Sequence, residues 1–118
     1  VPACNIDRHR LLQVIVNLLS NARHALRDSK NPKKTLRIRL LKRPKSFVIE
    51  VEDNGIGIKP EIMSRLFEHG FTTKVDGHGF GLHSSALAVQ MLRGTIQPFS
   101  DGPGQGARFV VELPLEKS

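Results

Sequence analysis

The sequence predicts an α+β fold, a two-layer α/β sandwich in which a mixed, mostly antiparallel sheet carries helices on one face. Some segments repeat their apolar residues at helical spacing, and others alternate apolar and polar residues as strands do. Their order is helix, two strands, short helix, loop, helix, two strands. The chain has 118 residues, 39% of them hydrophobic and 25% charged, which suits a single domain with one core over residues 1–118.

The first helix is expected over "DRHRLLQVIVNLLSNARHALRDS", with Asp7 as its N-cap and "SKNPKK" as its end. Apolar residues recur every three or four positions along it and would form the face that packs on the sheet. They are Leu11, Val14 or Ile15, Leu18, Ala22, and Ala25 or Leu26.

Two strands should follow, because apolar and polar residues alternate in "TLRIRL" and in "FVIEVED". The connection "KRPKS" makes them a hairpin. Glu50 and Glu52 of the second strand could pair with Arg37 and Arg39 of the first. A second hairpin is expected from "TIQPFS" and "ARFVVELP", which flank the turn "DGPGQG".

Two further helices are expected between the hairpins. "KPEIMSRLF" is typical of a short helix with Pro60 in its first turn. "LHSSALAVQMLRG" predicts a helix that begins near Leu82 and ends at Gly94. The loop between the two is rich in glycine.

The charge of the chain indicates an anionic partner, since its formal net charge is +7. Nucleic acid, a membrane surface and a nucleotide all qualify. The basic stretch at residues 30–45 lacks the interleaved aromatic residues of stacking surfaces and matches no DNA-binding motif, so a solvated hairpin face is favoured over a nucleic-acid patch. We therefore expect no nucleic-acid partner.

Cysteine content and hydropathy indicate the cellular compartment in which the domain is expected. Cys4 is the only cysteine, which excludes an internal disulfide and a Cys-based zinc site and favours a reducing, cytoplasmic location. The longest apolar run, "LLQVIVNLL", is too short to span a bilayer. We expect no membrane contact by this domain.

A polar stripe runs along the expected first helix, where Gln13, Asn17 and Asn21 recur every fourth residue. Asparagine is a poor helix former, so two of them in the middle of a helix need a reason. One reason is a solvated side of the helix. The other is an amide oxygen that ligates a hard cation such as Mg²⁺.

Asp53 continues the apolar face of its strand, after Phe47, Ile49 and Val51, so the alternation turns a carboxylate inward. A buried carboxylate without a partner is costly. One interpretation is that Asp53 caps the turn at Asn54 and Gly55. The other is that it accepts a hydrogen bond from the amino group of a buried ligand.

The stretch "DGHGFGLHSSA" feeds a run of backbone N–H groups into the start of a helix, where the dipole favours phosphate. It is neither a P-loop nor a dinucleotide motif, and a mobile surface loop would have the same composition. Just before it, Lys74 is placed to neutralise a terminal phosphate, although a lone lysine is commonly only solvated. Phe67 and Phe71 nearby could simply belong to the core.

Taken in order, "QVIVNLLSNARHAL", "DNGIGI", "LFEHGFTTK", "GHGFGL" and "GQGARFVVELP" resemble the ATP-site motifs and final strand of bacterial two-component sensor histidine kinases. The resemblance spans nearly the whole chain. It implies the Bergerat fold, with an ATP lid over residues 70–80. Further implied features are Mg²⁺ on Asn21, the adenine amine on Asp53, and a phosphate near Lys74 and His24.

The resemblance also implies the full set of site residues. Asn17 and Lys74 are the expected catalytic residues, and Asn21 is the expected metal ligand. The residues expected to contact ATP are Asn17, Asn21, His24, Asp53, Gly55, Gly57, Ile58, Phe67, Thr72, Thr73, Lys74, Gly77, His78, Gly79, Phe80, Gly81 and Leu82.

The implied activity is transfer of the γ-phosphoryl group of ATP to a histidine on a separate dimerisation and phosphoacceptor domain, for relay to the receiver domain of a response regulator. Members of the wider group that hydrolyse ATP carry glutamate where this chain has Asn17, which cannot accept a proton at neutral pH, so hydrolysis should be slow. The alternatives are a serine/threonine kinase of the same fold, and an ATP-gated interaction module without chemistry.

Several departures from the family pattern stand out. His78 occupies a place where a small hydroxyl residue is frequent, and Ala107 replaces a common threonine in the last strand. None of the five histidines lies in a sequence like the phosphoacceptor helix. We expect the dimerisation helices and one edge strand to lie outside this chain, the fragment to be monomeric, and a membrane anchor, if the parent has one, to lie elsewhere.

Overall fold

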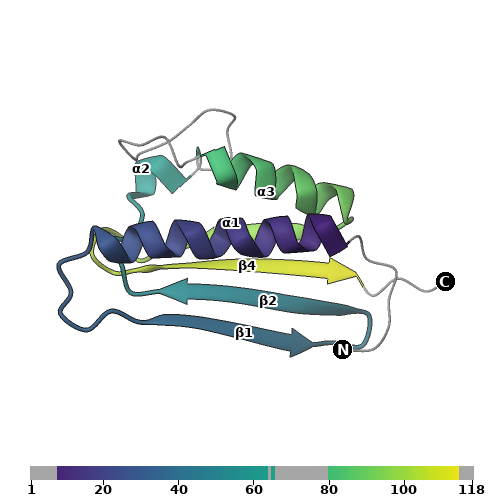
Figure 1. Cartoon of the computed structure of the whole chain (residues 1–118), viewed down its shortest axis with the longest axis horizontal. Helices are drawn as coiled ribbons and strands as arrows, with labels where there is room; N and C mark the ends of the chain where they lie inside the picture. The colour runs from purple at the N-terminus through teal and green to yellow at the C-terminus, as the bar shows by residue number, and fades with distance from the viewer. Residues whose placement is uncertain (1–7, 64, 66–79, 115–118) are drawn as a thin grey trace.

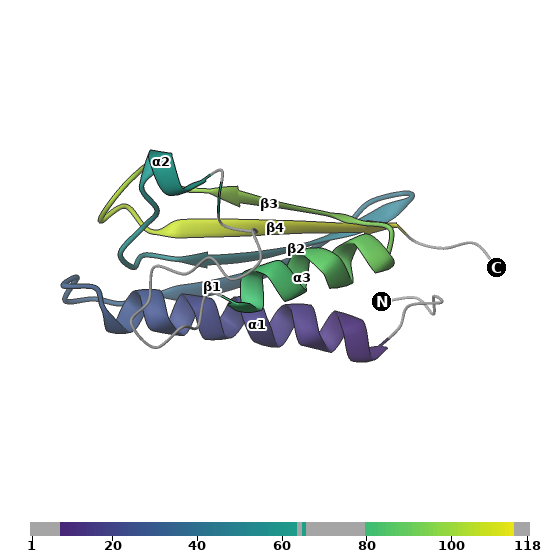
Figure 2. The same ribbon diagram turned by 90° about the horizontal axis from the view of Figure 1, so that it is seen from above.

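The computed structural model describes residues 8–63, 65 and 80–114, which form two layers. Figures 1 and 2 show the helices α1 (Arg8–Arg27) and α3 (Phe80–Met91) side by side on one face of the sheet, running in opposite directions. The short helix α2 (Pro60–Met63) lies at the end of the sheet where α1 ends, but on the side of β3, away from α1 (Figure 2). None of the helices in the described ranges combines the length and the apolar character that crossing a membrane requires.

The sheet contains the strands β1 (Leu36–Lys42), β2 (Ser46–Asp53), β3 (Thr95–Phe99) and β4 (Ala107–Pro114). Their spatial order is β1-β2-β4-β3, and each neighbouring pair is antiparallel. The long central ladder runs from Ser46 opposite Pro114 to Asp53 opposite Ala107. The predicted α+β sandwich with helices on one face is therefore confirmed.

The core lies between the two helices and the central strands. The predicted apolar face of α1 is confirmed, because Val14, Leu18, Ala22 and Ala25 are buried. Burying this face is the main source of stability for such a domain. The buried cluster includes Val14, Leu18, Ala22, Phe47, Ile49, Val51, Leu82, Ala88, Val89, Ala107, Phe109, Val111 and Leu113.

The edge strand β1 is covered much less than β2. Its alternating residues Leu36, Ile38 and Leu40 remain 43%, 55% and 56% exposed. They lie opposite Asp53, Val51 and Ile49 in the ladder and so share the helix-covered face. The helix α1 packs against β2, which leaves this side of β1 open.

The end of α3 differs in detail from the prediction. The helix begins at Phe80 rather than near Leu82, and it ends at Met91. Arg93 has a φ of 64°, so the left-handed residue that closes the helix is Arg93 and not Gly94. The N–H of Gly94 donates to the carbonyl of Val89 at 2.9 Å, as in a Schellman motif.

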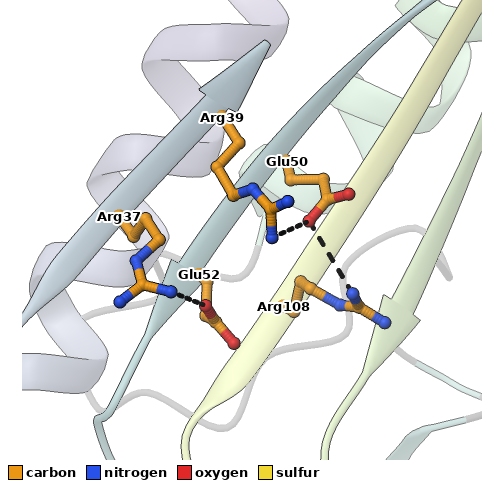
Figure 3. Close-up of polar contacts among 5 residues, drawn as sticks. All are labelled: Arg37, Arg39, Glu50, Glu52 and Arg108. Atoms are coloured by element: carbon orange, nitrogen blue, oxygen red, sulfur yellow. Dashed lines mark ion pairs between the residues drawn. The ribbon is translucent and has the colours of Figure 1, made fainter. Parts of the chain in front are cut away.

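Charged side chains cover the face of the sheet that carries no helices (Figure 3). Arg37 pairs with Glu52 at 3.8 Å and Arg39 pairs with Glu50 at 3.9 Å, which confirms the predicted pairing across the hairpin. Arg108 of β4 adds a second partner to Glu50 at 3.7 Å. Two arginines therefore flank one largely buried carboxylate.

Candidate functional site

Asp53 ends β2 with its side chain buried, at 5% exposed. Its Oδ1 atom accepts a hydrogen bond from the backbone N–H of Gly55 at 2.8 Å. The two interpretations of Asp53 are thus compatible: the carboxylate is turned inward, and one of its oxygens also caps the following turn. This bond fixes the orientation of the carboxylate.

The segment after Asp53 lies against the last turns of α1. The N–H of Ile56 donates to the carbonyl of Ala25 at 3.2 Å. A Cβ atom on Gly55 would lie 2.6 Å from the carbonyl carbon and oxygen of Ala25, so the two backbones are in direct contact. Asn21 is one helical turn before Ala25. The fold therefore brings the Asp53 segment close to the part of α1 that holds the polar stripe.

The same segment is joined on its other side to the turn between β3 and β4. The N–H of Gly104 donates to the carbonyl of Ile56 at 2.7 Å, and that of Gly106 donates to the carbonyl of Gly55 at 3.2 Å. Gly57 has a φ of 75°, and a Cβ there would collide with the carbonyl oxygen of Gly102. Only glycine fits this position without strain.

The polar stripe on α1 is partly covered. Gln13 is exposed, whereas Asn17, Asn21 and His24 are half-buried. In both views α3 begins beside the middle of α1 and runs along its N-terminal half, so the last turns of α1, which contact the Asp53 segment, lie beyond the start of α3 (Figures 1 and 2). Asn17 and Asn21 therefore do not lie on a fully solvated side of the helix, which was one of the two interpretations of the polar stripe.

Other predicted residues are placed by α3 and by the segment after Gly57. Phe80 and Gly81 belong to the first turn of α3. The side chain of Leu82 is 4% exposed within the core, so only its backbone could meet a ligand. Ile58 is half-buried and packs against the core. The predicted residues Phe67, Thr72, Thr73, Lys74, Gly77, His78 and Gly79 lie outside the described residues.

The prediction missed Ser100, which joins two parts of the candidate site. Its hydroxyl accepts a hydrogen bond from the N–H of Ile58 at 3.0 Å and donates one to the carbonyl of Gly106 at 2.7 Å. The available signal is "DGPGQG", because glycines at alternate positions also indicate close backbone approach in the other loops. Between two strands of a predicted hairpin, the same glycines indicate only a turn.

Side chains of the usual metal-binding types form no second candidate site among the residues that the structure describes. Within the described ranges, no group of three or more His, Cys, Asp or Glu side chains is arranged to hold a metal ion. The amide oxygens of the stripe on α1 remain the candidates for a hard cation, which prefers oxygen ligands.

Comparison with known proteins identifies the family. Residues 6–117 match the family described as histidine kinase-, DNA gyrase B-, and HSP90-like ATPase. Similar curated proteins include the sensor protein CitS of Halalkalibacterium halodurans, 43% identical over 109 residues, and the two-component sensor PprA of Pseudomonas aeruginosa, 42% identical over 113 residues. The matches cover 92% and 90% of this chain, but only 20% and 12% of those proteins.

Solved structures show the same fold. The mycobacterial sensor histidine kinase MprB superposes with a TM-score of 0.81 at 23% identity, covering 98% of this chain and 78% of that one. The catalytic domain of the histidine kinase ThkA superposes with a TM-score of 0.78 at 27% identity, covering 92% of this chain and 69% of that one. The match to the family extends over all of the described helices and strands, and the chain therefore belongs to the histidine kinase-, DNA gyrase B- and HSP90-like ATPase family.

Proposed function

We propose that this chain binds Mg-ATP and donates the γ-phosphoryl group to a histidine on the phosphoacceptor and dimerisation domain of its parent protein. The phosphoryl group would then pass to an aspartate on the receiver domain of a response regulator. The buried carboxylate of Asp53, held in place beside α1, carries this proposal. The names of the relatives, which are sensor proteins and two-component sensors, support it.

Asp53 is suited to bind the exocyclic amine of adenine. A carboxylate can only accept hydrogen bonds, and an amine donates them. Because Gly55 holds one carboxylate oxygen at 2.8 Å, the group is oriented before a ligand arrives. The absence of side chains at Gly55 and Gly57 lets the segment pack against Ala25 of α1 and against Gly102 of the turn between β3 and β4, which holds the carboxylate of Asp53 in place.

Asn21 is suited to hold the magnesium ion that accompanies ATP. Its amide oxygen is a hard ligand of the kind Mg²⁺ takes in small numbers, with phosphate and water supplying the others. The residue is half-buried one turn from the Asp53 segment. When bound, the ion neutralises phosphate charge and so favours transfer of the terminal phosphoryl group.

Asn17 favours phosphoryl transfer over hydrolysis. It lies on the same stripe of α1 as Asn21, one turn earlier, and is half-buried. Its amide cannot take a proton from water at neutral pH, so it can orient groups by hydrogen bonds but cannot activate water as a base. The nucleophile would be an imidazole from another domain. Lys74, on the predicted lid, would neutralise the terminal phosphate.

The test is to mix the chain with γ-labelled ATP and the separately produced phosphoacceptor domain of the parent protein. We expect label on that domain that is labile in acid and stable in alkali, as phosphohistidine is. The chain alone should stay unlabelled, because none of its five histidines lies in a sequence like the acceptor helix.

Two outcomes would replace the proposal. Acid-stable label on serine would identify a serine/threonine kinase of the same fold. Tight ATP binding without transfer to any partner would identify an interaction module. A phosphoacceptor domain with its histidine replaced by glutamine is the matched control.

A further inference from the structure

We propose that Ser100 is a positioning residue that fixes the adenine-binding segment, residues 53–58, against the sheet. The inference rests on the proposed role of Asp53 in binding adenine. Ser100 directly follows β3, so its backbone is anchored to the edge of the sheet. Its side chain reaches toward the segment from the side away from α1.

The hydroxyl of Ser100 joins three backbone groups. It donates its one proton to the carbonyl of Gly106 at 2.7 Å. It accepts hydrogen bonds from the N–H of Ile58 at 3.0 Å and from the N–H of Gly102 at 3.3 Å. The side chain of Ser100 therefore connects two parts of the turn between β3 and β4, and it connects this turn to the adenine-binding segment.

The ties lead to Asp53 through a short series of hydrogen bonds. Gly106, held by Ser100, donates its N–H to the carbonyl of Gly55 at 3.2 Å. Gly55 in turn donates its N–H to Oδ1 of Asp53 at 2.8 Å. A shift of Gly106 would thereby be transmitted through one residue, Gly55, to the carboxylate.

Close packing leaves little room to absorb such a shift. A Cβ on Gly106 would collide with the carbonyl oxygen of Asp53, and a Cβ on Gly57 would collide with that of Gly102. The turn and the segment are thus in backbone contact at two points. When the hydroxyl is lost, the N–H of Ile58 and the carbonyl of Gly106 lose a partner in a half-buried setting, which is unfavourable.

Ser100 acts through other residues, so its loss should affect nucleotide binding and not the transfer step. We expect Ser100→Ala to weaken ATP binding about threefold to tenfold, the usual worth of one or two such hydrogen bonds. The KM for ATP should rise by a similar factor while kcat stays within about twofold. Ser100→Thr, which keeps the hydroxyl, should restore most of the affinity.

Ser46 supplies a matched control at the other end of the sheet. Ser46 lies opposite Pro114 in the ladder between β2 and β4. Its half-buried hydroxyl donates a hydrogen bond to the carboxylate of Glu112 at 2.7 Å. Ser46→Ala removes a serine hydrogen bond of similar length and burial, far from Asp53 in the ladder. We expect it to lower resistance to urea as Ser100→Ala does, but to leave nucleotide affinity unchanged.

The experiment is calorimetric titration of each variant with a non-hydrolysable ATP analogue and Mg²⁺, together with urea unfolding. Equal affinity in Ser100→Ala and the parent would overturn the inference, as would an equal loss of affinity in Ser46→Ala. Ser100→Cys, close in volume but a poor hydrogen-bonding group, serves if the alanine variant does not fold, and parent-like affinity there also overturns it. If the parent chain itself binds no analogue, the proposed function fails, and the inference with it.

Discussion

Asp53 lies directly opposite Ala107 in the ladder between β2 and β4, and both side chains are buried. On its other side Asp53 is opposite Leu36 of β1. The carboxylate is thus the one polar side chain on this rung of the described sheet. A threonine in place of Ala107 would have added a hydroxyl there. If the chain binds adenine as proposed, recognition by side chains on this rung would therefore depend on Asp53.

Asp53→Asn should weaken binding of adenine nucleotides strongly. The amide can keep an oxygen toward the N–H of Gly55, so the turn should survive, but its NH₂ group would then face the donor of adenine. Leaving such groups unmatched costs about 1 to 3 kcal/mol, or roughly 5-fold to 150-fold in affinity. Calorimetry measures the change. Asp101→Asn, at an exposed position of the nearby turn, is the control, and parent-like affinity in Asp53→Asn would exclude the adenine assignment.

Asn21→Ala should remove the magnesium dependence of ATP binding. The substitution deletes the proposed metal ligand while alanine keeps the helix. Titrations with ATP in Mg²⁺ and in EDTA should differ for the parent and agree for the variant. Gln13→Ala, on the same stripe but exposed, should respond to Mg²⁺ as the parent does. A variant at position 21 that still distinguishes the two buffers would refute the role.

Leu18→Ala should destabilise the domain by about 2 to 5 kcal/mol, because it opens a cavity in a packed core. The side chain of Leu18 is 0% exposed, between α1 and the sheet. Leu12→Ala removes the same atoms from a side chain that is 59% exposed, so its effect should be below about 1 kcal/mol. Urea unfolding followed by circular dichroism measures both. Similar midpoints for the two variants would contradict the described packing.

Glu50→Ala should cost more stability than Glu52→Ala. The side chain of Glu50 is 12% exposed and pairs with both Arg39 and Arg108, whereas that of Glu52 is 45% exposed and pairs with Arg37. Removing the first should cost about 1 to 3 kcal/mol and the second about 0 to 1 kcal/mol. Urea midpoints at low and high salt give the comparison. The order of the two variants is the critical result, and its reversal would show that the shared pairing is not stabilising.

The arrangement of elements followed from local patterns. Helical spacing located the buried face of α1, since Val14, Leu18 and Ala22 contact the core as expected. Alternation located both hairpins and turned Asp53 inward. These features depend on a period of 3.6 or 2 residues, which a sequence displays directly.

The contacts that complete the candidate site did not follow from such patterns. Ser100 and Ile58 are 42 residues apart, and their hydrogen bond depends on how the second hairpin pairs with the first in the sheet. The ion pair between Arg108 and Glu50 also could not be predicted from local patterns, because the pairing of β2 with β4 brings these two residues together. The end of α3 shows that local patterns do not predict every backbone conformation. Gly94 correctly indicates where the helix ends, but Arg93 and not Gly94 adopts the left-handed conformation.

The turn between β3 and β4 is hydrogen-bonded to the rest of the domain, although much of the turn is exposed to solvent. Such loop tips are ordinarily where insertions and tags are tolerated. Here the backbone of Gly104 and Gly106 is hydrogen-bonded to the segment after Asp53, so a tag or a longer loop between residues 101 and 106 would separate that segment from the sheet. The exposed connection at residues 43–45, between β1 and β2, is the better place for a fluorescent label or an inserted reporter.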